Sequence, residues 1–294
     1  MTIYHHVDVF ADAAYTGNSL AVFIDPPPLD SGQMLRITQE LRHFETIFVT
    51  TLAEPDTVRA RVFDLSGELD FAGHPVLGAA GVLHEVRGKG ANAEWRFALP
   101  ARTVQVTTRL SKGHLSGVLD QGRPEFVAPA VPLEPNPIAQ SIGLTATDLD
   151  PELPPQIVST GLRYLIVPVR AGALARARIA RPDFDGFLGE LGAQFAYVLD
   201  AVALEGRHWN NDGVLEDVAT GSAAGCVAGY LLRHRRIPDS VPASLTQGRF
   251  TGRPSRIAIT AYGTPDEVSR VTVGGAVTVV STGTLRALPA GDSA

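Results

Sequence analysis

The sequence predicts an α/β (α+β) fold made of two similar halves, each with a sheet wrapped around a central helix. Two segments rich in glycine and alanine, at about 74–86 and 221–235, each follow two strand-like segments and begin just after a glycine. A shift of 148 residues superposes identical residues of these segments: Gly73 on Gly221, Ala80 on Ala228, Gly81 on Gly229 and Leu83 on Leu231. We interpret this agreement as an internal duplication, whose two halves would meet with a cleft between them.

The first half is expected to contain strands, one surface helix and one buried helix. Strands are predicted at 3–10, 20–24, 45–51 and 58–64, with further strands to about Val118. The spacing of apolar residues predicts a helix over 31–42, with Ser31 as its N-cap. Because glycine costs about 1 kcal/mol in a helix interior, the glycines of 74–86 indicate a helix that other backbone approaches closely. This helix is apolar nearly all round, which is typical of a buried element.

The second half should follow a linker in the early part of 119–156, a stretch rich in proline and aspartate. Helices are predicted near 137–143, 182–190 and 221–235, and strands at 163–169, 195–200, 203–209, 255–262, 268–274 and 276–280. The tail from Leu288 is expected to be frayed. We therefore expect one unit of 1–120 with a C-terminal strand near 281–288, and a second unit of 121–280, with the active-site cleft between the two.

The composition narrows the possible partners. The chain has 294 residues, a net charge of −6 and no dense block of Lys and Arg, which argues against nucleic acid as a main partner. The single cysteine, Cys226, can form neither an internal disulfide nor a cysteine-based metal site. Because it lies among small apolar residues, we expect a core position. The N-terminus does not resemble a signal peptide and no long uncharged apolar run occurs, so a cytoplasmic protein without a membrane span is expected.

The two helix starts, Gly73-His74 and Gly221-Ser222, are candidates for an anion site. Helix N-termini leave amide groups free and carry partial positive charge, so two of them facing one cleft would bind a carboxylate. The alternative is that both are ordinary helix starts, with Ser222 or Thr220 as caps.

Three further side chains could carry chemistry. Glu45 precedes the apolar strand Thr46–Val49, where it is either a surface cap or a partly buried acid/base. Asp217 precedes the second buried helix and could orient a substrate hydroxyl or amine, or cap the local turn. His74 could make one hydrogen bond to a ligand as a neutral imidazole, or simply pack.

No pattern typical of a metal or nucleotide site is convincing. Gly88-Lys89-Gly90 is interpreted as a loop, and His5 and His6 should point to opposite faces of a strand. These motifs therefore indicate neither a metal site nor a dinucleotide-binding site.

Five short motifs in order along the chain resemble those of the PhzF-like family of phenazine biosynthesis. They are Gly17-Asn18-Ser19-Leu20-Ala21-Val22-Phe23, Glu45-Thr46, Phe71-Ala72-Gly73-His74-Pro75, Glu216-Asp217-Val218-Ala219-Thr220-Gly221-Ser222-Ala223, and Gln247-Gly248 with Gly252-Arg253-Pro254-Ser255. Each motif alone is weak, but together they span nearly the whole chain.

The resemblance implies a diaminopimelate epimerase-like fold, a homodimer, no cofactor, and a substrate such as 2,3-dihydro-3-hydroxyanthranilate. It also implies that Glu45 takes a proton from one ring carbon and returns it to another. His74, Asp217 and Ser222 would hold or polarise the substrate. The resemblance further implies substrate contacts from five residues: Asn18, Gly73, Thr220, Gly221 and Gln247.

Racemases and epimerases of this fold carry one cysteine just before each helix-opening glycine, where this chain has Ala72 and Thr220. Neither residue can act as a thiolate base, so two-thiol racemisation is excluded. Ser19 and Val218 stand where the family commonly has proline, and Thr246 stands where an acidic residue is frequent. These departures leave the substrate open.

Three hypotheses follow. The first is a PhzF-like isomerase that moves a proton on a small carboxylate. The second is a dehydratase, cyclase or tautomerase acting on another small biosynthetic carboxylate with the same residues. The third is a non-catalytic protein that binds a small molecule.

Overall fold

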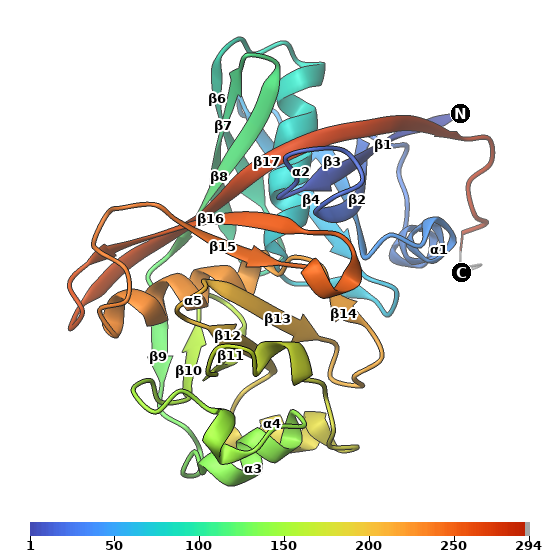
Figure 1. Cartoon of the computed structure of the whole chain (residues 1–294). Helices are drawn as coiled ribbons and strands as arrows, with labels where there is room; N and C mark the ends of the chain where they lie inside the picture. The colour runs from blue at the N-terminus through green and yellow to red at the C-terminus, as the bar shows by residue number, and fades with distance from the viewer. Residues whose placement is uncertain (292–294) are drawn as a thin grey trace. The chain divides into compact units, whose positions relative to one another are not determined.

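The computed structural model describes residues 1–291 and shows a mixed, sheet-dominated α+β fold with few helices (Figure 1). The chain divides into two units, one of Met1–Asp120 with the stretch from Gly274 onward, the other of Gln121–Val273. Among residues 1–291, none of the helices has the length and apolar character that a membrane span requires.

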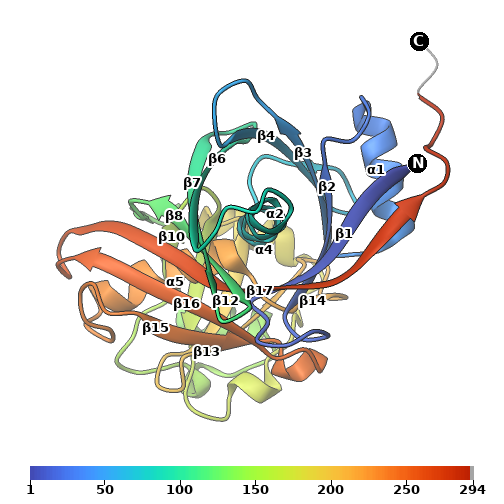
Figure 2. The same ribbon diagram turned by 90° about the horizontal axis from the view of Figure 1, so that it is seen from above.

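The first unit consists of a curved sheet around one buried helix. Its elements are β1 (Thr2–Val9), β2 (Asn18–Ile24), α1 (Ser31–Leu41), β3 (Glu45–Thr51), β4 (Thr57–Phe63), β5 (Glu68–Leu69), α2 (Gly73–Val86), β6 (Asn92–Ala98), β7 (Thr103–Ser111), β8 (His114–Gly122) and the last part of β17 (Val268–Leu285). β1 pairs with β2 and β17, while β2–β3 and β4–β6 are parallel pairs. Figure 2 shows strands of this unit surrounding α2.

Helix α2 is buried as the sequence predicts, and its glycines explain how. Every residue from Gly73 to His84 is buried. A Cβ atom at Gly78 would lie 2.5 Å from Leu20 Cδ2, so only glycine lets β2 come this close. Ala21 and Phe23 of the same strand face the other way and pack against α1.

The N-cap of α1 differs from the prediction. Asp30, not Ser31, caps the helix: its carboxylate accepts a hydrogen bond from the Gln33 amide, and the Gln33 side chain accepts one from the Asp30 amide. This reciprocal arrangement is a capping box, in which both residues satisfy amides at the helix start. Ser31 is instead the first residue of the helix.

The second unit repeats the sheet-and-helix plan and adds short helices. Its elements are β9 (Glu125–Val127), α3 (Pro135–Ser141), η1 (Ala146–Asp148), β10 (Gln156–Ser159), β11 (Arg163–Pro168), η2 (Leu174–Arg176), α4 (Phe184–Leu191), β12 (Phe195–Asp200), β13 (Glu205–Trp209), β14 (Glu216–Asp217), α5 (Gly221–Arg233), β15 (Ala243–Gln247), η3 (Arg249–Thr251), β16 (Ser255–Gly263) and the first part of β17. Helices α3 and α4 pack on one apolar cluster with β11 and β12.

Strand pairing confirms the internal duplication. The parallel pair β2–β3 corresponds to the parallel pair β11–β12, and β4–β6 corresponds to β13–β15. The antiparallel pairs β3–β4 and β4–β5 correspond to β12–β13 and β13–β14. In both units a two-residue strand leads directly into the buried helix, α2 or α5.

Two predictions near the C-terminus are wrong. The strands expected at 268–274 and 276–280 are one continuous strand, β17. Its glycines do not interrupt the strand. A Cβ atom at Gly274 would lie 2.6 Å from the Gly117 carbonyl oxygen, so glycine at this position lets the two backbones approach closely. Beyond β17, the carbonyls of Pro289 and Ala290 accept hydrogen bonds from α1 side chains, so this part of the expected frayed tail is held. Residues 292–294 of that tail lie outside the described residues.

The expected linker is also partly structured. Residues 119–122 complete β8, and Glu125–Val127 form β9, which pairs with β10.

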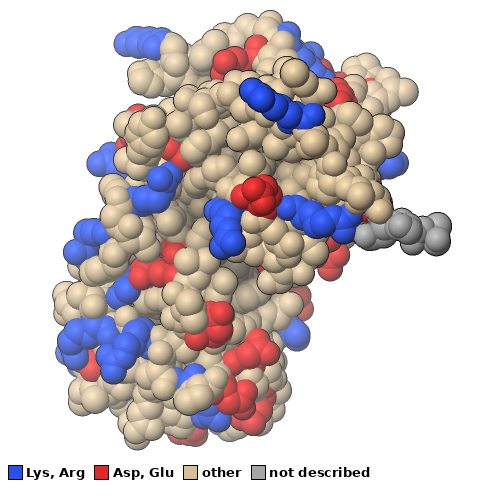
Figure 3. Space-filling model, turned by 90° about the vertical axis from the view of Figure 1, so that its right-hand side faces the viewer, with Lys and Arg blue, Asp and Glu red and all other residues tan. Residues whose placement is uncertain are grey.

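The face of the molecule in Figure 3 carries Lys and Arg side chains interspersed with Asp and Glu. The expectation that nucleic acid is not a partner stays a prediction.

Candidate active site

Glu45 and His74 form a close pair in the first unit. Glu45 is the first residue of β3, and His74 is the second residue of α2. Glu45 Oε2 lies 3.0 Å from His74 Nε2, and the two side chains are 15% and 5% exposed. The contact has ion-pair distance but misses the angles of a good hydrogen bond.

The local fold places this pair at a helix N-terminus. Parallel pairing sets Glu45 opposite Leu20 of β2, on the side of the sheet that faces α2. Ala72, the N-cap of α2, makes no side-chain capping hydrogen bond. The first amides of a helix have no acceptor within the helix, so the start of α2 favours an anion.

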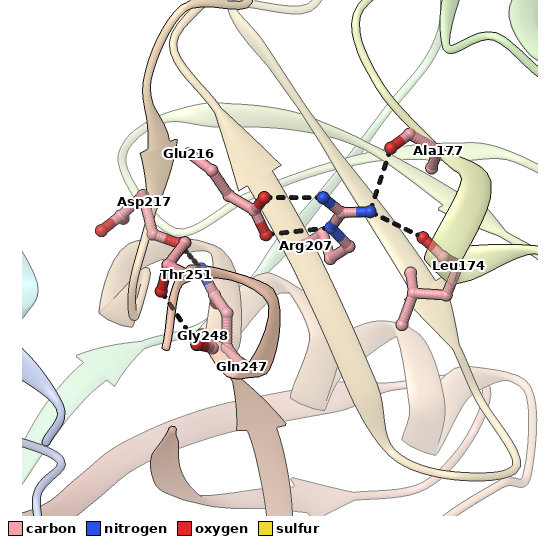
Figure 4. A network of polar contacts seen from close by, with 8 residues as sticks. All are labelled: Leu174, Ala177, Arg207, Glu216, Asp217, Gln247, Gly248 and Thr251. Carbon is pink, nitrogen blue, oxygen red and sulfur yellow. Dashed lines mark hydrogen bonds and ion pairs between the residues drawn. The ribbon is translucent and has the colours of Figure 1, made fainter. Parts of the chain in front are cut away.

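Asp217 lies in a dense polar network of the second unit. Its Oδ2 accepts a hydrogen bond of 2.6 Å from the Thr220 hydroxyl, and Oδ1 accepts one of 3.2 Å from the Ala219 amide. The Gln247 side chain donates to the Asp217 carbonyl at 2.8 Å (Figure 4). Asp217 is therefore held in one orientation by contacts to both its main chain and its carboxylate.

Gln247 ties this network together. Its Nε2 donates to the Asp217 carbonyl and to the Thr220 hydroxyl. Its Oε1 accepts from the Thr220 amide and from the Tyr197 hydroxyl. Burial raises the pKa of Tyr197 well above its usual value, with the charge of Asp217 adding to the effect, so this hydroxyl stays a donor. These contacts make Gln247 a positioning residue for Asp217 and Thr220.

The start of α5 carries Thr220, Gly221 and Ser222. Thr220 is the N-cap but makes no side-chain capping hydrogen bond, since its hydroxyl bonds to Asp217 instead. The Gly221 carbonyl accepts from the Gln121 side chain at 2.9 Å. The Ser222 hydroxyl lies 2.7 Å from the Tyr164 hydroxyl. Thr220 therefore occupies the N-cap position without a side-chain capping hydrogen bond, and the proposed anion site at this helix start stays a prediction.

Asn18 and the three departures from the family pattern also have defined places. Asn18 is buried at the start of β2. The Ser19 hydroxyl lies 2.6 Å from His43 Nδ1 and 3.2 Å from His6 Nε2, so it is within hydrogen-bond distance of two histidine side chains. The Val218 carbonyl accepts from the Ser255 hydroxyl, and the Thr246 amide donates to the Leu204 carbonyl.

Sequence reasoning missed an ion pair that supports Asp217. Arg207 makes two hydrogen bonds to the carboxylate of Glu216, at 2.9 and 2.6 Å, and donates to the carbonyls of Leu174 and Ala177 (Figure 4). Its guanidinium also lies over the rings of Trp209 and Phe250. Glu216 precedes Asp217 in β14, so this pair fixes the strand that presents Asp217. The only sequence signal was that Glu68 superposes on Glu216 in the duplication.

Cys226 cannot serve as a base. The residue is fully buried in α5, and burial raises the pKa of its thiol to about 12. This confirms the predicted core position. The helix-opening positions hold Ala72 and Thr220, so the two units bring no thiol to either helix start.

The fold and the sequence place this chain among known proteins. A solved structure described as a probable proline racemase from Agrobacterium radiobacter shares the fold, with a TM-score of 0.63 at 11% identity over 97% of this chain and 93% of that one. A solved structure described as a predicted epimerase from Pseudomonas aeruginosa is 43% identical, with a TM-score of 0.91, over 98% of this chain and all of that one.

The match becomes more specific at the level of families. The family described as phenazine biosynthesis-like protein (PhzC-PhzF) matches residues 7–283. The trans-2,3-dihydro-3-hydroxyanthranilate isomerase of Pseudomonas chlororaphis is 31% identical over 96% of this chain and 99% of its own length. The chain therefore belongs to the phenazine biosynthesis-like family. Like the relatives that are named isomerases, it is an isomerase.

Proposed function

We propose that this isomerase moves a proton between two carbons of a small conjugated carboxylate of the 2,3-dihydro-3-hydroxyanthranilate type, with Glu45 as both base and acid and without a cofactor. The observation that carries the proposal is the contact of 3.0 Å between Glu45 and His74 at the start of buried α2. The name of the related isomerase supplies the substrate type.

In the proposed reaction, Glu45 removes a carbon-bound proton, and the electron pair spreads through the conjugated system of the substrate. The protonated Glu45 then returns the proton to a different carbon. No atom is gained or lost, so the step requires neither water nor an oxidant. General acid–base catalysis of this kind contributes about 10²–10⁴-fold to the rate.

His74 is assigned to orient the base. Its Nε2 contacts Oε2 of Glu45, and we assign the other carboxylate oxygen, Oε1, to the substrate. An imidazole at a helix N-terminus is disfavoured as a cation. A neutral imidazole can donate one hydrogen bond, so it can orient the carboxylate.

The second unit is assigned to binding. The free amides at the start of α5, at Gly221 and Ser222, favour the substrate carboxylate. Asp217, an acceptor fixed by Thr220 and Gln247, would take a hydroxyl or amine proton of the same substrate.

The test is proton NMR of 2,3-dihydro-3-hydroxyanthranilate in D₂O with wild-type protein and with Glu45→Gln. We expect isomerised, deuterium-labelled product with wild type and a loss of at least about 10²-fold with the variant. Glu40→Gln, which changes an exposed glutamate on α1, is the matched control and should behave as wild type. Normal turnover by Glu45→Gln would show that another group is the base.

A further inference from the structure

Tyr164 makes a contact at the start of α5 that none of the recognised motifs includes. It is the second residue of β11, and its hydroxyl lies 2.7 Å from the hydroxyl of Ser222, the second residue of α5. The two residues are 2% and 8% exposed, and 58 positions separate them in the chain. Two hydroxyl groups are thus paired in a buried setting, at a helix end that favours anions.

The ring of Tyr164 is fixed by its neighbours. It stacks on Phe195 with the centroids 5.4 Å apart, and meets the edge of His208 at 5.6 Å. His208 is itself held, because its Nδ1 donates to the Ala196 carbonyl at 2.9 Å. Aromatic contacts of this geometry restrict the ring. The hydroxyl of Tyr164 therefore meets Ser222 from a constant direction.

The chemistry of the two groups decides which one donates. A phenol proton is more acidic than an alcohol proton, so the phenol is the stronger donor and the serine oxygen the better acceptor. When Tyr164 donates to Ser222 Oγ, the serine proton is left to donate to a third group. That proton would then be presented at the start of α5.

We infer that Tyr164 is a positioning residue that makes Ser222 a hydrogen-bond donor and thereby selects a carboxylate over an uncharged carboxamide at this site. The inference rests on the proposed role of Ser222 in binding the substrate. A carboxylate only accepts hydrogen bonds, whereas a carboxamide also presents two N–H donors. The partial positive charge of the α5 N-terminus acts in the same direction.

The probes for the test are anthranilate and 2-aminobenzamide. They share a ring and an amino group, but the first carries a carboxylate where the second carries a carboxamide. Calorimetry would give their dissociation constants with wild type, Tyr164→Phe, Ser222→Ala and the double variant. The matched control is Tyr230→Phe, since Tyr230 lies on the same helix and its hydroxyl donates to the distant Pro154 carbonyl.

Tyr164→Phe should weaken anthranilate binding by about two- to tenfold, the effect of one neutral hydrogen bond, and should weaken 2-aminobenzamide binding less. The same substitution should have no further effect in the Ser222→Ala background. Tyr230→Phe should leave both constants unchanged.

Equal losses for both probes, or the same loss of anthranilate affinity with and without Ser222, would overturn the inference, because a merely structural role predicts them. The proposed function is judged separately by wild-type turnover. Selective binding without turnover would contradict the isomerase substrate but support Tyr164. Turnover by wild type without any effect of Tyr164→Phe on binding would support the proposed function and contradict the role of Tyr164.

Discussion

The starts of α2 and α5 occupy equivalent places in the two units but differ in side-chain chemistry. At α2, Ala72 makes no side-chain capping hydrogen bond, and Glu45 Oε2 lies 3.0 Å from His74 Nε2. At α5, the Thr220 hydroxyl bonds to Asp217 and Gln247, and the Ser222 hydroxyl bonds to Tyr164. In the proposed function, the first helix start holds the group that gains and loses a proton, and the second holds the groups that bind the substrate.

The two units nevertheless share an Arg–Glu ion pair on the strands that precede the buried helix. In the first unit, Arg61 of β4 makes two hydrogen bonds to Glu68 of β5, just as Arg207 of β13 does to Glu216 of β14. In each unit this pair ties down the two-residue strand that precedes the buried helix. The comparison indicates that the duplication kept the supporting pair and changed the residues at the helix start.

The largest expected effect concerns these two ion pairs. Arg207 and Glu216 are 10% and 12% exposed, whereas Arg61 and Glu68 are 27% and 29% exposed. Arg207→Ala leaves a buried carboxylate and should reduce the free energy of unfolding by about 3–5 kcal/mol. Arg61→Ala should reduce it by no more than about 1 kcal/mol, since water screens the pair. Urea unfolding of the two variants measures both values, and equal losses would show that burial does not distinguish the units.

A second expected effect concerns Cys226, the single thiol. Because burial raises its pKa to about 12, almost no thiolate exists at pH 8, and the native protein should react very slowly with a thiol reagent. In urea, the exposed thiol should react with a chromogenic thiol reagent and release one equivalent of its chromophore per chain. Rapid reaction of the folded protein would contradict the core position of this residue.

The smallest expected effect is a dependence of stability on pH through His234 at the end of α5. Burial, with the charges of Arg233 and Arg236, lowers the pKa of His234 below its usual 6.5. The unfolded chain therefore takes up the proton first, so stability should be complete above pH 6.5 and decline as the pH falls below it. His234→Gln should reduce this decline in acid unfolding curves. An unchanged pH dependence in that variant would assign the decline to other groups.

Much of the fold was predictable because it repeats. The glycines of 74–86 and 221–235 correctly indicated buried helices, and the apolar spacing gave α1. The continuity of β17 could not be predicted, since Gly274 is explained by the approach of Gly117 from a strand far away in the sequence.

The candidate site was predictable only where a motif carries it. Glu45 and His74 were found from local sequence, and the structure places them in contact. The partners that hold the second site were not found. Tyr164, for example, lies 58 positions from Ser222, and a lone tyrosine on an apolar strand gives no periodic signal. Long-range hydrogen bonds of this kind become visible only when the strands are placed.

The most direct test of the account compares one residue from each helix start in the same experiment. Substrate dissociation constants and rates of deuterium incorporation would be measured for Glu45→Gln and Ser222→Ala. We predict that Glu45→Gln binds substrate but loses deuterium incorporation, while Ser222→Ala binds more weakly but incorporates deuterium when saturated. If Ser222→Ala lost incorporation at saturation, or Glu45→Gln retained it, the division between a reacting and a binding helix start would be contradicted.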